Sequence, residues 1–289
     1  VANAGDTPAE VVVDRNGLEI AKTVVAPNGL EKLYLPWVHE LKGNTFDECG
    51  QAAPLASTVR SQAGAYHLVS SVPVTVYQFN ALEYRGQGGP PNKSWASCPG
   101  NKHCALFDLT MGCYSFSNDA SLLLPTAALT GNYRITSQAG MPAASMSPYF
   151  AVTGTADGTT VTVKVSSTGE IVAGGGVTAT GAGEIVQFAL NRGDVVQLLG
   201  APTADLAGSL VQANHPVQVI AGVPCINQPI ASAACDHIEE TVPPAETLGK
   251  RYIVTSPTGA LGNVVGHIVR IFGNVDGTML SYPSGAPAG

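Results

Sequence analysis

The residues with the most chemical potential are Asp-His-Ile-Glu-Glu at positions 236–240, which bring one imidazole and three carboxylates together. Such groups serve general acid–base catalysis and bind metal ions. Their spacing does not suit two ligands on one helix face, and the proline pair 243–244 excludes that helix. A thiol–imidazole dyad of Cys225 and His237 is a second possibility, but a disulfide from Cys225 to Cys235 would remove its nucleophile. We therefore predict no catalytic residues and no enzymatic activity.

A related stretch lies earlier in the chain and lacks the histidine and the paired glutamates. Residues 118–137 align with residues 235–256, and matches such as Pro125 on Pro244 are shifted by 119 positions. The two stretches share a proline, a leucine, a tyrosine and a strand-like end. Packing needs these shared residues, whereas catalysis would need the ionisable ones. The comparison therefore favours a structural role for the motif at 236–240.

A structural role assigns partners to the ionisable groups of the motif. We predict that Asp236 bonds nearby backbone amides, as aspartate does in turns. We predict that Glu239 or Glu240 pairs with Lys250 or Arg251. On this interpretation the stretch binds no metal ion, and we expect no cofactor.

The similarity extends over the chain and predicts its domain organisation. Residues 72–77 resemble residues 215–220 at an offset of 143, and the turn at 157–159 resembles that at 276–278 at an offset of 119. A repeat of this length has the size of a small domain. The predicted boundaries are a first repeat at 1–150 with a cysteine-containing insertion at 81–117, a second repeat at 151–270, and the start of a third repeat or a closing strand at 271–289.

The composition excludes several classes of protein. The 289 residues are 45% hydrophobic and 12% charged, with a formal net charge of −7, so the chain can bury a core and does not have a disordered composition. The 14 lysine and arginine residues form no basic run, so we expect no nucleic-acid partner. There is no run of about 18 apolar residues, so we expect no membrane insertion.

The six cysteines predict disulfide bonds formed in an oxidising compartment. They lie between predicted strands, and none forms a close Cys-x-x-Cys pair. A zinc site that includes His103 and Cys104 is the competing interpretation, but the tight ligand spacing of structural zinc sites is missing. We predict disulfides and no metal site, with the pairs Cys225–Cys235, Cys49–Cys113 and Cys98–Cys104.

Short segments rich in β-branched or alternating apolar residues predict strands. In residues 159–165 the valines face one way and the polar residues the other, which is typical of a sheet with one face on the core. Segments 184–190 and 194–199 flank Asn-Arg-Gly at 191–193, which predicts a hairpin. The other predicted strands are 9–13, 31–37, 65–69 and 73–79.

Two proline-containing stretches, 120–129 and 238–248, show no alternation, and we predict extended connections there. The 33 glycines and 20 prolines punctuate the chain at close intervals, as in all-β proteins. The predicted fold is therefore all-β, with two tandem related modules that are most simply antiparallel β-sandwiches. A propeller-like ring is the alternative arrangement.

Several motifs together resemble a known family. They are Pro-Val-Thr-Val-Tyr-Gln-Phe-Asn at 73–80, Asn-Asp-Ala-Ser-Leu-Leu-Leu-Pro at 118–125, Asn-Arg-Gly-Asp-Val-Val-Gln-Leu at 191–198, Asp-Leu-Ala-Gly-Ser-Leu-Val at 205–211 with Pro-Val-Gln-Val at 216–219, and Cys-Asp-His-Ile-Glu-Glu at 235–240. In this order they resemble the IgGFc-binding protein N-terminal domain family over nearly the whole chain. The insertion at 81–117, with its extra cysteines, departs from the family.

The resemblance implies an extracellular, non-enzymatic binding or adhesion module with loop disulfides, such as occurs in secreted or surface proteins of bacteria. It places Cys225 and Cys235 where the family has paired loop cysteines. It also implies that neighbouring domains of a longer chain are among the partners, together with an extracellular protein or glycan. The expected location is extracellular or at the cell surface.

Aromatic residues near the insertion supply candidate binding residues. Tyr77 and Phe79 alternate as core residues do, so Tyr84 and Trp95 are the better candidates for contact with a protein or a sugar. The predicted contact surfaces are the loops 81–117 and 224–235. Binding or adhesion is the predicted function, and a lectin-like carbohydrate-binding domain is the alternative.

Overall fold

The described part of the chain is all-β, as predicted. The computed structural model describes residues 1–36, 38–42, 55–79, 119–227, 236–255, 258–259, 262 and 268–281. Its helical elements are short: α1 (His39–Lys42) and the 3-10 helices η1 (Thr126–Ala128), η2 (Pro142–Ala144) and η3 (Ala245–Thr247). Within these ranges no helix has the length and apolar character needed to span a membrane.

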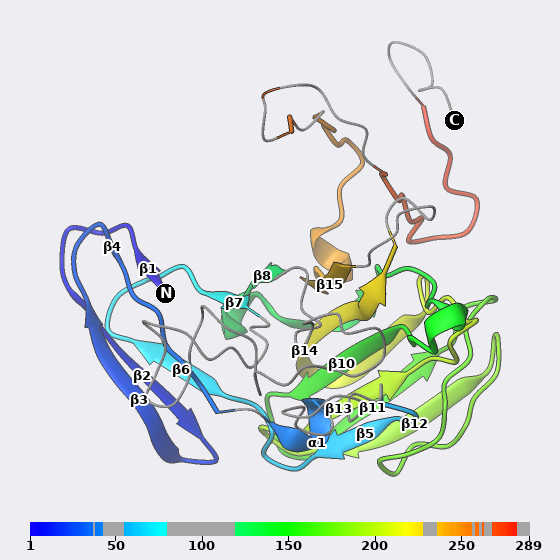
Figure 1. The fold of residues 1–289 in the computed structure, drawn as a ribbon, viewed down its shortest axis with the longest axis horizontal. Helices are drawn as coiled ribbons and strands as arrows, with labels where there is room; N and C mark the ends of the chain where they lie inside the picture. The colour runs from blue at the N-terminus through cyan, green and yellow to red at the C-terminus, as the bar shows by residue number, and fades with distance from the viewer. Residues whose placement is uncertain are drawn as a thin grey trace, which may run out of the picture.

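The largest element is an eight-stranded antiparallel sheet (Figure 1). Its strands run in the order β12-β11-β14-β10-β13-β5, and β9 and β15 also pair with β14. The strands are β5 (Val59–Ser61), β9 (Thr130–Arg134), β10 (Tyr149–Gly154), β11 (Thr159–Lys164), β12 (Ile185–Leu190), β13 (Val195–Leu199), β14 (Leu210–Ile226) and β15 (Asp236–Thr241).

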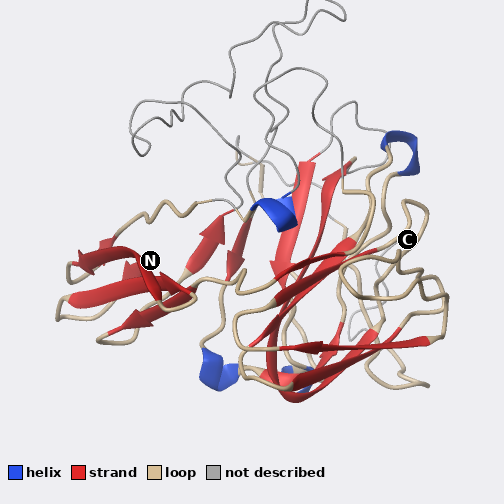
Figure 2. Cartoon of the chain, turned by 90° about the horizontal axis from the view of Figure 1, so that it is seen from below, coloured by secondary structure: helices blue, strands red, loops and turns tan. Residues whose placement is uncertain are grey.

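Strand β14 organises this sheet because its two halves have different neighbours. Residues 210–212 pair with both β11 and β9, whereas residues 220–222 pair with both β10 and β15. The exposed residues Asn-His-Pro at 214–216 separate the halves, and the register with β9 shifts there. Proline has no N–H to donate to a ladder, which suits such an interruption. The sheet curls in this region, as Figure 2 shows.

The curled sheet encloses one hydrophobic core. In β11 Val161 and Val163 are buried, and in β12 Val186 and Phe188 are buried, each pair with a more exposed residue between. This period of two places one face of each strand on the core. The same cluster of buried residues contains Tyr133, which comes from the strand β9.

The N-terminal residues form smaller sheets around a second, smaller core. Strand β2 (Ala9–Arg15) lies between β3 (Leu18–Val25) and β6 (His67–Ser70), and β1 (Ala2–Asn3) pairs with β4 (Gly29–Leu30). Ala9, Val11 and Val25 form the buried cluster. A two-stranded ribbon of β7 (Tyr77–Phe79) and β8 (Ala120–Leu122) lies between these sheets and the main sheet (Figure 1).

Most predicted strands are confirmed, with small differences at their ends, but the strand predicted at 31–37 is wrong for the described residues 31–36. Leu33 packs against the small core, whereas Leu35 is exposed. Of the two alternating apolar residues that the structure describes in this segment, only Leu33 therefore packs against a core. The segment is tied down instead by its end, where the Tyr66 hydroxyl donates to the carbonyl oxygen of Pro36 at 2.7 Å.

The predicted hairpin of residues 184–190 and 194–199 is also wrong, although its turn is present. Gly193 has a φ of 83°, which favours glycine, and both flanking strands form. However, β12 pairs with β11, and β13 pairs with β10 and β5. The turn carries the chain from one half of the curled sheet to the other.

The two proline stretches contain strands that were not predicted. Strand β8 occupies 120–122, and β15 extends to residue 241. The prolines come after the strands, and Pro125 and Pro244 stand immediately before the helices η1 and η3. Proline therefore ends each strand without interrupting it.

The division of the chain into repeats stays a prediction. Strands β5 and β9, from the predicted first repeat, lie in the same sheet as β11 to β15 from the second. Strand β10 spans the predicted boundary at residue 150. The two predicted repeats therefore contribute to one common core.

Candidate functional site

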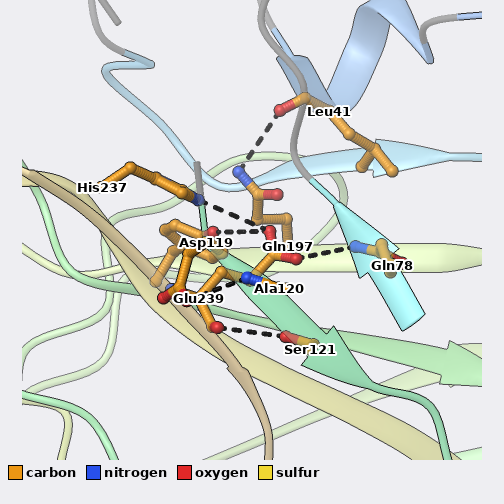
Figure 3. Close-up of polar contacts among 9 residues, drawn as sticks. Leu41, Gln78, Asp119, Ala120, Ser121, Gln197, His237 and Glu239 are labelled. Atoms are coloured by element: carbon orange, nitrogen blue, oxygen red, sulfur yellow. Dashed lines mark hydrogen bonds and ion pairs between the residues drawn. The ribbon is translucent and has the colours of Figure 1, made fainter. Parts of the chain in front are cut away.

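The motif Asp-His-Ile-Glu-Glu at 236–240 lies in strand β15, at the edge of the main sheet. Its residues 238–241 pair with residues 220–223 of β14. Glu239 is a buried carboxylate, only 6% exposed, and it lies at the centre of a group of polar contacts (Figure 3). A buried charged group is costly unless hydrogen bonds compensate it, so its partners decide its role.

Three side chains surround the Glu239 carboxylate, two of them from distant parts of the sequence and one from β15 itself. Gln78 Nε2 donates to Glu239 Oε1 at 2.8 Å, and the Tyr149 hydroxyl donates to Oε2 at 3.3 Å. His237 Nε2 is 3.8 Å from Oε2, the distance of an ion pair when the imidazole is protonated. The alternative pairing of Glu240 with Lys250 or Arg251 stays a prediction, but the predicted pairing of Glu239 with either of them is wrong. The reason is that this side of β15 faces β7 and β10, whose positions local sequence does not reveal.

Backbone contacts of Glu239 join β15 to the start of β8. Asp119 Oδ2 accepts from the Glu239 amide at 2.8 Å, and Asp119 Oδ1 accepts from the Ala120 amide at 2.9 Å. Ser121 Oγ donates to the Glu239 carbonyl oxygen at 3.0 Å. Asp119 thus bonds backbone amides in the way predicted for Asp236, whereas the role of Asp236, which belongs to β15, stays a prediction.

Burial and nearby carboxylates raise the pKa of two side chains at this site, Tyr149 and Glu240. Burial, together with the nearby Glu239 carboxylate, raises the pKa of Tyr149 well above its ordinary value. The phenol therefore stays a hydrogen-bond donor at neutral pH. Partial burial and then the charge of Asp119 raise the pKa of Glu240.

The phenylalanine variant of Tyr149 should change how stability depends on alkaline pH. The folded-state pKa of Tyr149 lies above the unfolded value of 10.0, so its contribution to stability is fully present below pH 10 and falls as the pH rises above it. Tyr149→Phe should flatten this alkaline fall, at the loss of about 1 kcal/mol at pH 7 from one hydrogen bond. Urea unfolding of both chains from pH 7 to 11 measures the difference. Parallel curves for the two chains would contradict this account.

The arrangement joins strands and has no evident chemistry of its own. It connects Gln78 of β7, Asp119 beside β8, Tyr149 of β10 and Glu239 of β15. Among the described residues, no group of three or more His, Cys, Asp or Glu side chains could hold a metal ion. An open hollow of about 320 Å³ lies elsewhere, between β9, β14 and η3. We interpret the Glu239 cluster as a structural junction.

Several predicted site residues lie outside the described part of the chain. These are Tyr84, Trp95, Cys49, Cys98, Cys104, Cys113 and Cys235. Cys225, at the end of β14, is disulfide-bonded. Because the other five cysteines all lie outside the described residues, its pairing with Cys235 stays a prediction.

Tyr77 and Phe79, which we predicted as core residues, are instead exposed. Their exposed fractions are 49% and 63%, and Leu122, the cross-strand neighbour of Tyr77, is 42% exposed. A period of two shows that alternate residues share one face of a strand but not which face is buried. The sequence analysis therefore missed these residues as surface candidates. Tyr77, Phe79 and Leu122 together form an exposed apolar face on this ribbon.

The comparisons with known proteins agree with the family resemblance. A family model described as IgGFc binding protein matches residues 119–289. The human IgGFc-binding protein is 30% identical over 140 residues, which cover 47% of this chain and 2% of the human protein. No solved structure matches the chain. Because the matched residues hold β8 to β15, and with them most of the core and the Glu239 junction, this chain belongs to the IgGFc-binding protein family.

Proposed function

We propose that this chain is an extracellular protein-binding module with a role in adhesion and no enzymatic activity. The observation that carries the proposal is the family match over residues 119–289. The human relative is called IgGFc-binding protein, and this chain spans 2% of its length, so the activity of that whole protein supports only a proposal here. The predicted loop disulfides fit an extracellular location.

The apolar face of the β7–β8 ribbon supports this function. Tyr77, Phe79 and Leu122 are large, exposed and adjacent on one ribbon. Aromatic side chains supply much of the binding energy of protein interfaces because they bury a large area with few rotatable bonds. Residues 80–118, which carry Tyr84 and Trp95, connect the two strands of this ribbon. We propose that the ribbon face and this insertion form one contact surface, with the loop 224–235 as a second.

A binding measurement with the Fc fragment of human IgG tests the proposal. Surface plasmon resonance should show saturable binding to the immobilised chain. Phe79→Ser should weaken it about tenfold or more, since exposed aromatic residues at an interface dominate its energy. Ile185→Ser is the matched control, because Ile185 is 64% exposed on β12, away from the ribbon, and its replacement should leave binding unchanged.

Two outcomes would count against this function. Equal binding of Fc and Fab fragments would show that the chain does not recognise Fc. Equal binding by the wild-type chain and Phe79→Ser would remove the ribbon face from the contact surface. The lectin-like alternative is tested separately by a glycan array, where binding that is lost in Trp95→Ala would favour it.

A further inference from the structure

The last part of the described chain carries apolar residues that no core covers. Tyr252 is 69% exposed, Ile253 93% and Val254 58%, and Ile268, Ile271 and Met279 are also more than half exposed. Residues of this kind are typical of strands. Soluble proteins rarely expose such a group of residues unless another surface covers it.

The local structure around Tyr252 repeats that around Tyr133. After Pro125 and after Pro244 the chain forms one 3-10 turn that ends at a leucine, 119 positions apart in the two cases. The Thr130 amide donates to the Tyr133 hydroxyl at 3.2 Å, and the Gly249 amide donates to the Tyr252 hydroxyl at 2.7 Å. Residues 249–254 therefore correspond to residues 130–135 in their place after the 3-10 turn and in this amide-to-hydroxyl contact, although only residues 130–134 form a strand.

The strand pairs before these segments also correspond. In the ribbon Tyr77 pairs with Leu122, and in the main sheet Ile220 pairs with Thr241. Ile220 follows Tyr77 by 143 positions, and Thr241 follows Leu122 by 119 positions. These are the two offsets of the sequence repeats. The pairing of β2 with β6 and that of β11 with β14 are also both antiparallel.

Strand β9 shows what the first of these segments does. It leaves the ribbon that precedes it and pairs with β14, where Asn132 lies opposite Gln212. Tyr133 is 1% exposed there, and its hydroxyl donates to the carbonyl oxygen of Val217 at 2.5 Å, across the bulge in β14. The strand that ends the first predicted repeat thus completes the sheet of the second.

We propose that residues 249–254 do the same for a following repeat unit, in which they pair with the counterpart of residues 210–212 and bury Tyr252. Successive units would then be joined by strand exchange as well as by the chain itself. Residues 268–281 support this assignment. The residues 119 positions before them, 149–162, include buried residues of the main core. Phe150 and Val152 are fully buried, whereas their counterparts Val269 and Ile271 are about half exposed.

Hydrogen exchange measured by mass spectrometry tests the proposal in two chains. In the 289-residue chain the amides of 130–134 should be protected, whereas those of 249–254 should exchange within seconds. In a longer chain, in which residues 155–248 follow Gly273, a following unit is present because Gly273 corresponds to Gly154, and residues 249–254 occur only once. The amides of 249–254 should there exchange at least 100-fold more slowly.

A charged substitution supplies the control. Val254→Asp should abolish the new protection in the longer chain, and it should leave the melting temperature of the 289-residue chain unchanged because Val254 is exposed there. Rapid exchange of 249–254 in the longer chain would overturn the proposal. Protection in the 289-residue chain that grows with its concentration would also overturn it, since the partner would then be a second copy. One available edge for such a copy is β6, which among the described residues pairs only with β2.

Discussion

Replacing Glu239 by alanine should lower the free energy of unfolding by about 2–4 kcal/mol. The carboxylate accepts hydrogen bonds from Gln78 Nε2 and from the Tyr149 hydroxyl, and both donors lie at the junction of β7, β10 and β15. Alanine would leave the buried Tyr149 hydroxyl without its acceptor, at about 1–3 kcal/mol, and would remove the hydrogen bond from the exposed Gln78, at about 0.5–1.5 kcal/mol. Tyr149 is only 7% exposed, so water cannot easily replace the lost acceptor.

The glutamine variant separates hydrogen bonding from packing. Glu239→Gln keeps the shape of the side chain and one acceptor oxygen, so it should lose about 1 kcal/mol and remain closer to the wild type. Urea unfolding at pH 7, followed by fluorescence and by circular dichroism, gives the three free energies. If alanine and glutamine destabilise the chain equally, the Glu239 junction does not act through these two hydrogen bonds.

Strands β11 and β12 of the main sheet could be predicted from the sequence because burial alternates within each of them. In residues 159–164 each valine that faces the core is followed by a polar residue that does not, and that pattern needs no knowledge of neighbouring strands. The positive φ of Gly193 was likewise predictable, since it depends on a few adjacent residues. These features are local, and local patterns identified them correctly.

The pairing of strands could not be predicted in this way. The segments around Gly193 are adjacent in sequence, yet β12 and β13 belong to opposite halves of the curled sheet. What separates them is β14, whose exposed interruption at 214–216 lets one strand serve both halves. The sequence of residues 184–199 does not predict this arrangement, because it depends on which strand faces pack against each other in the core.

At the candidate site, too, local features could be predicted from the sequence and long-range contacts could not. The proline pair after the motif correctly excluded a helix with metal or catalytic ligands on one face, and β15 is a strand. The partners of Glu239 were missed because Gln78 and Tyr149 are 161 and 90 residues away in the sequence. The position of Asp119, aligned with Asp236 in the repeat, was the available signal that carboxylates meet near this strand.

Two tyrosines that occupy the same place in the predicted repeats should differ sharply when each is replaced by alanine. Tyr133→Ala should lower the free energy of unfolding by about 3–5 kcal/mol, as expected for a large aromatic residue removed from a core. Tyr133 is 1% exposed and its hydroxyl bonds to Val217, so the variant loses both packing and a hydrogen bond. Tyr252→Ala should change the free energy by about 0.5 kcal/mol or less, since Tyr252 is 69% exposed.

The two tyrosines share a local hydrogen bond, so the contrast between these variants depends on the partner strand, which among the described residues only Tyr133 has. Each hydroxyl accepts from an amide three residues earlier, so a local effect would destabilise the two variants equally. Urea unfolding of Tyr133→Ala, Tyr252→Ala and the wild-type chain measures the difference. Equal losses would mean that residues 249–254 are already packed in the 289-residue chain. A loss confined to Tyr133→Ala means that packing against the partner strand β14, and not the amide-to-hydroxyl contact that both tyrosines share, supplies the stability.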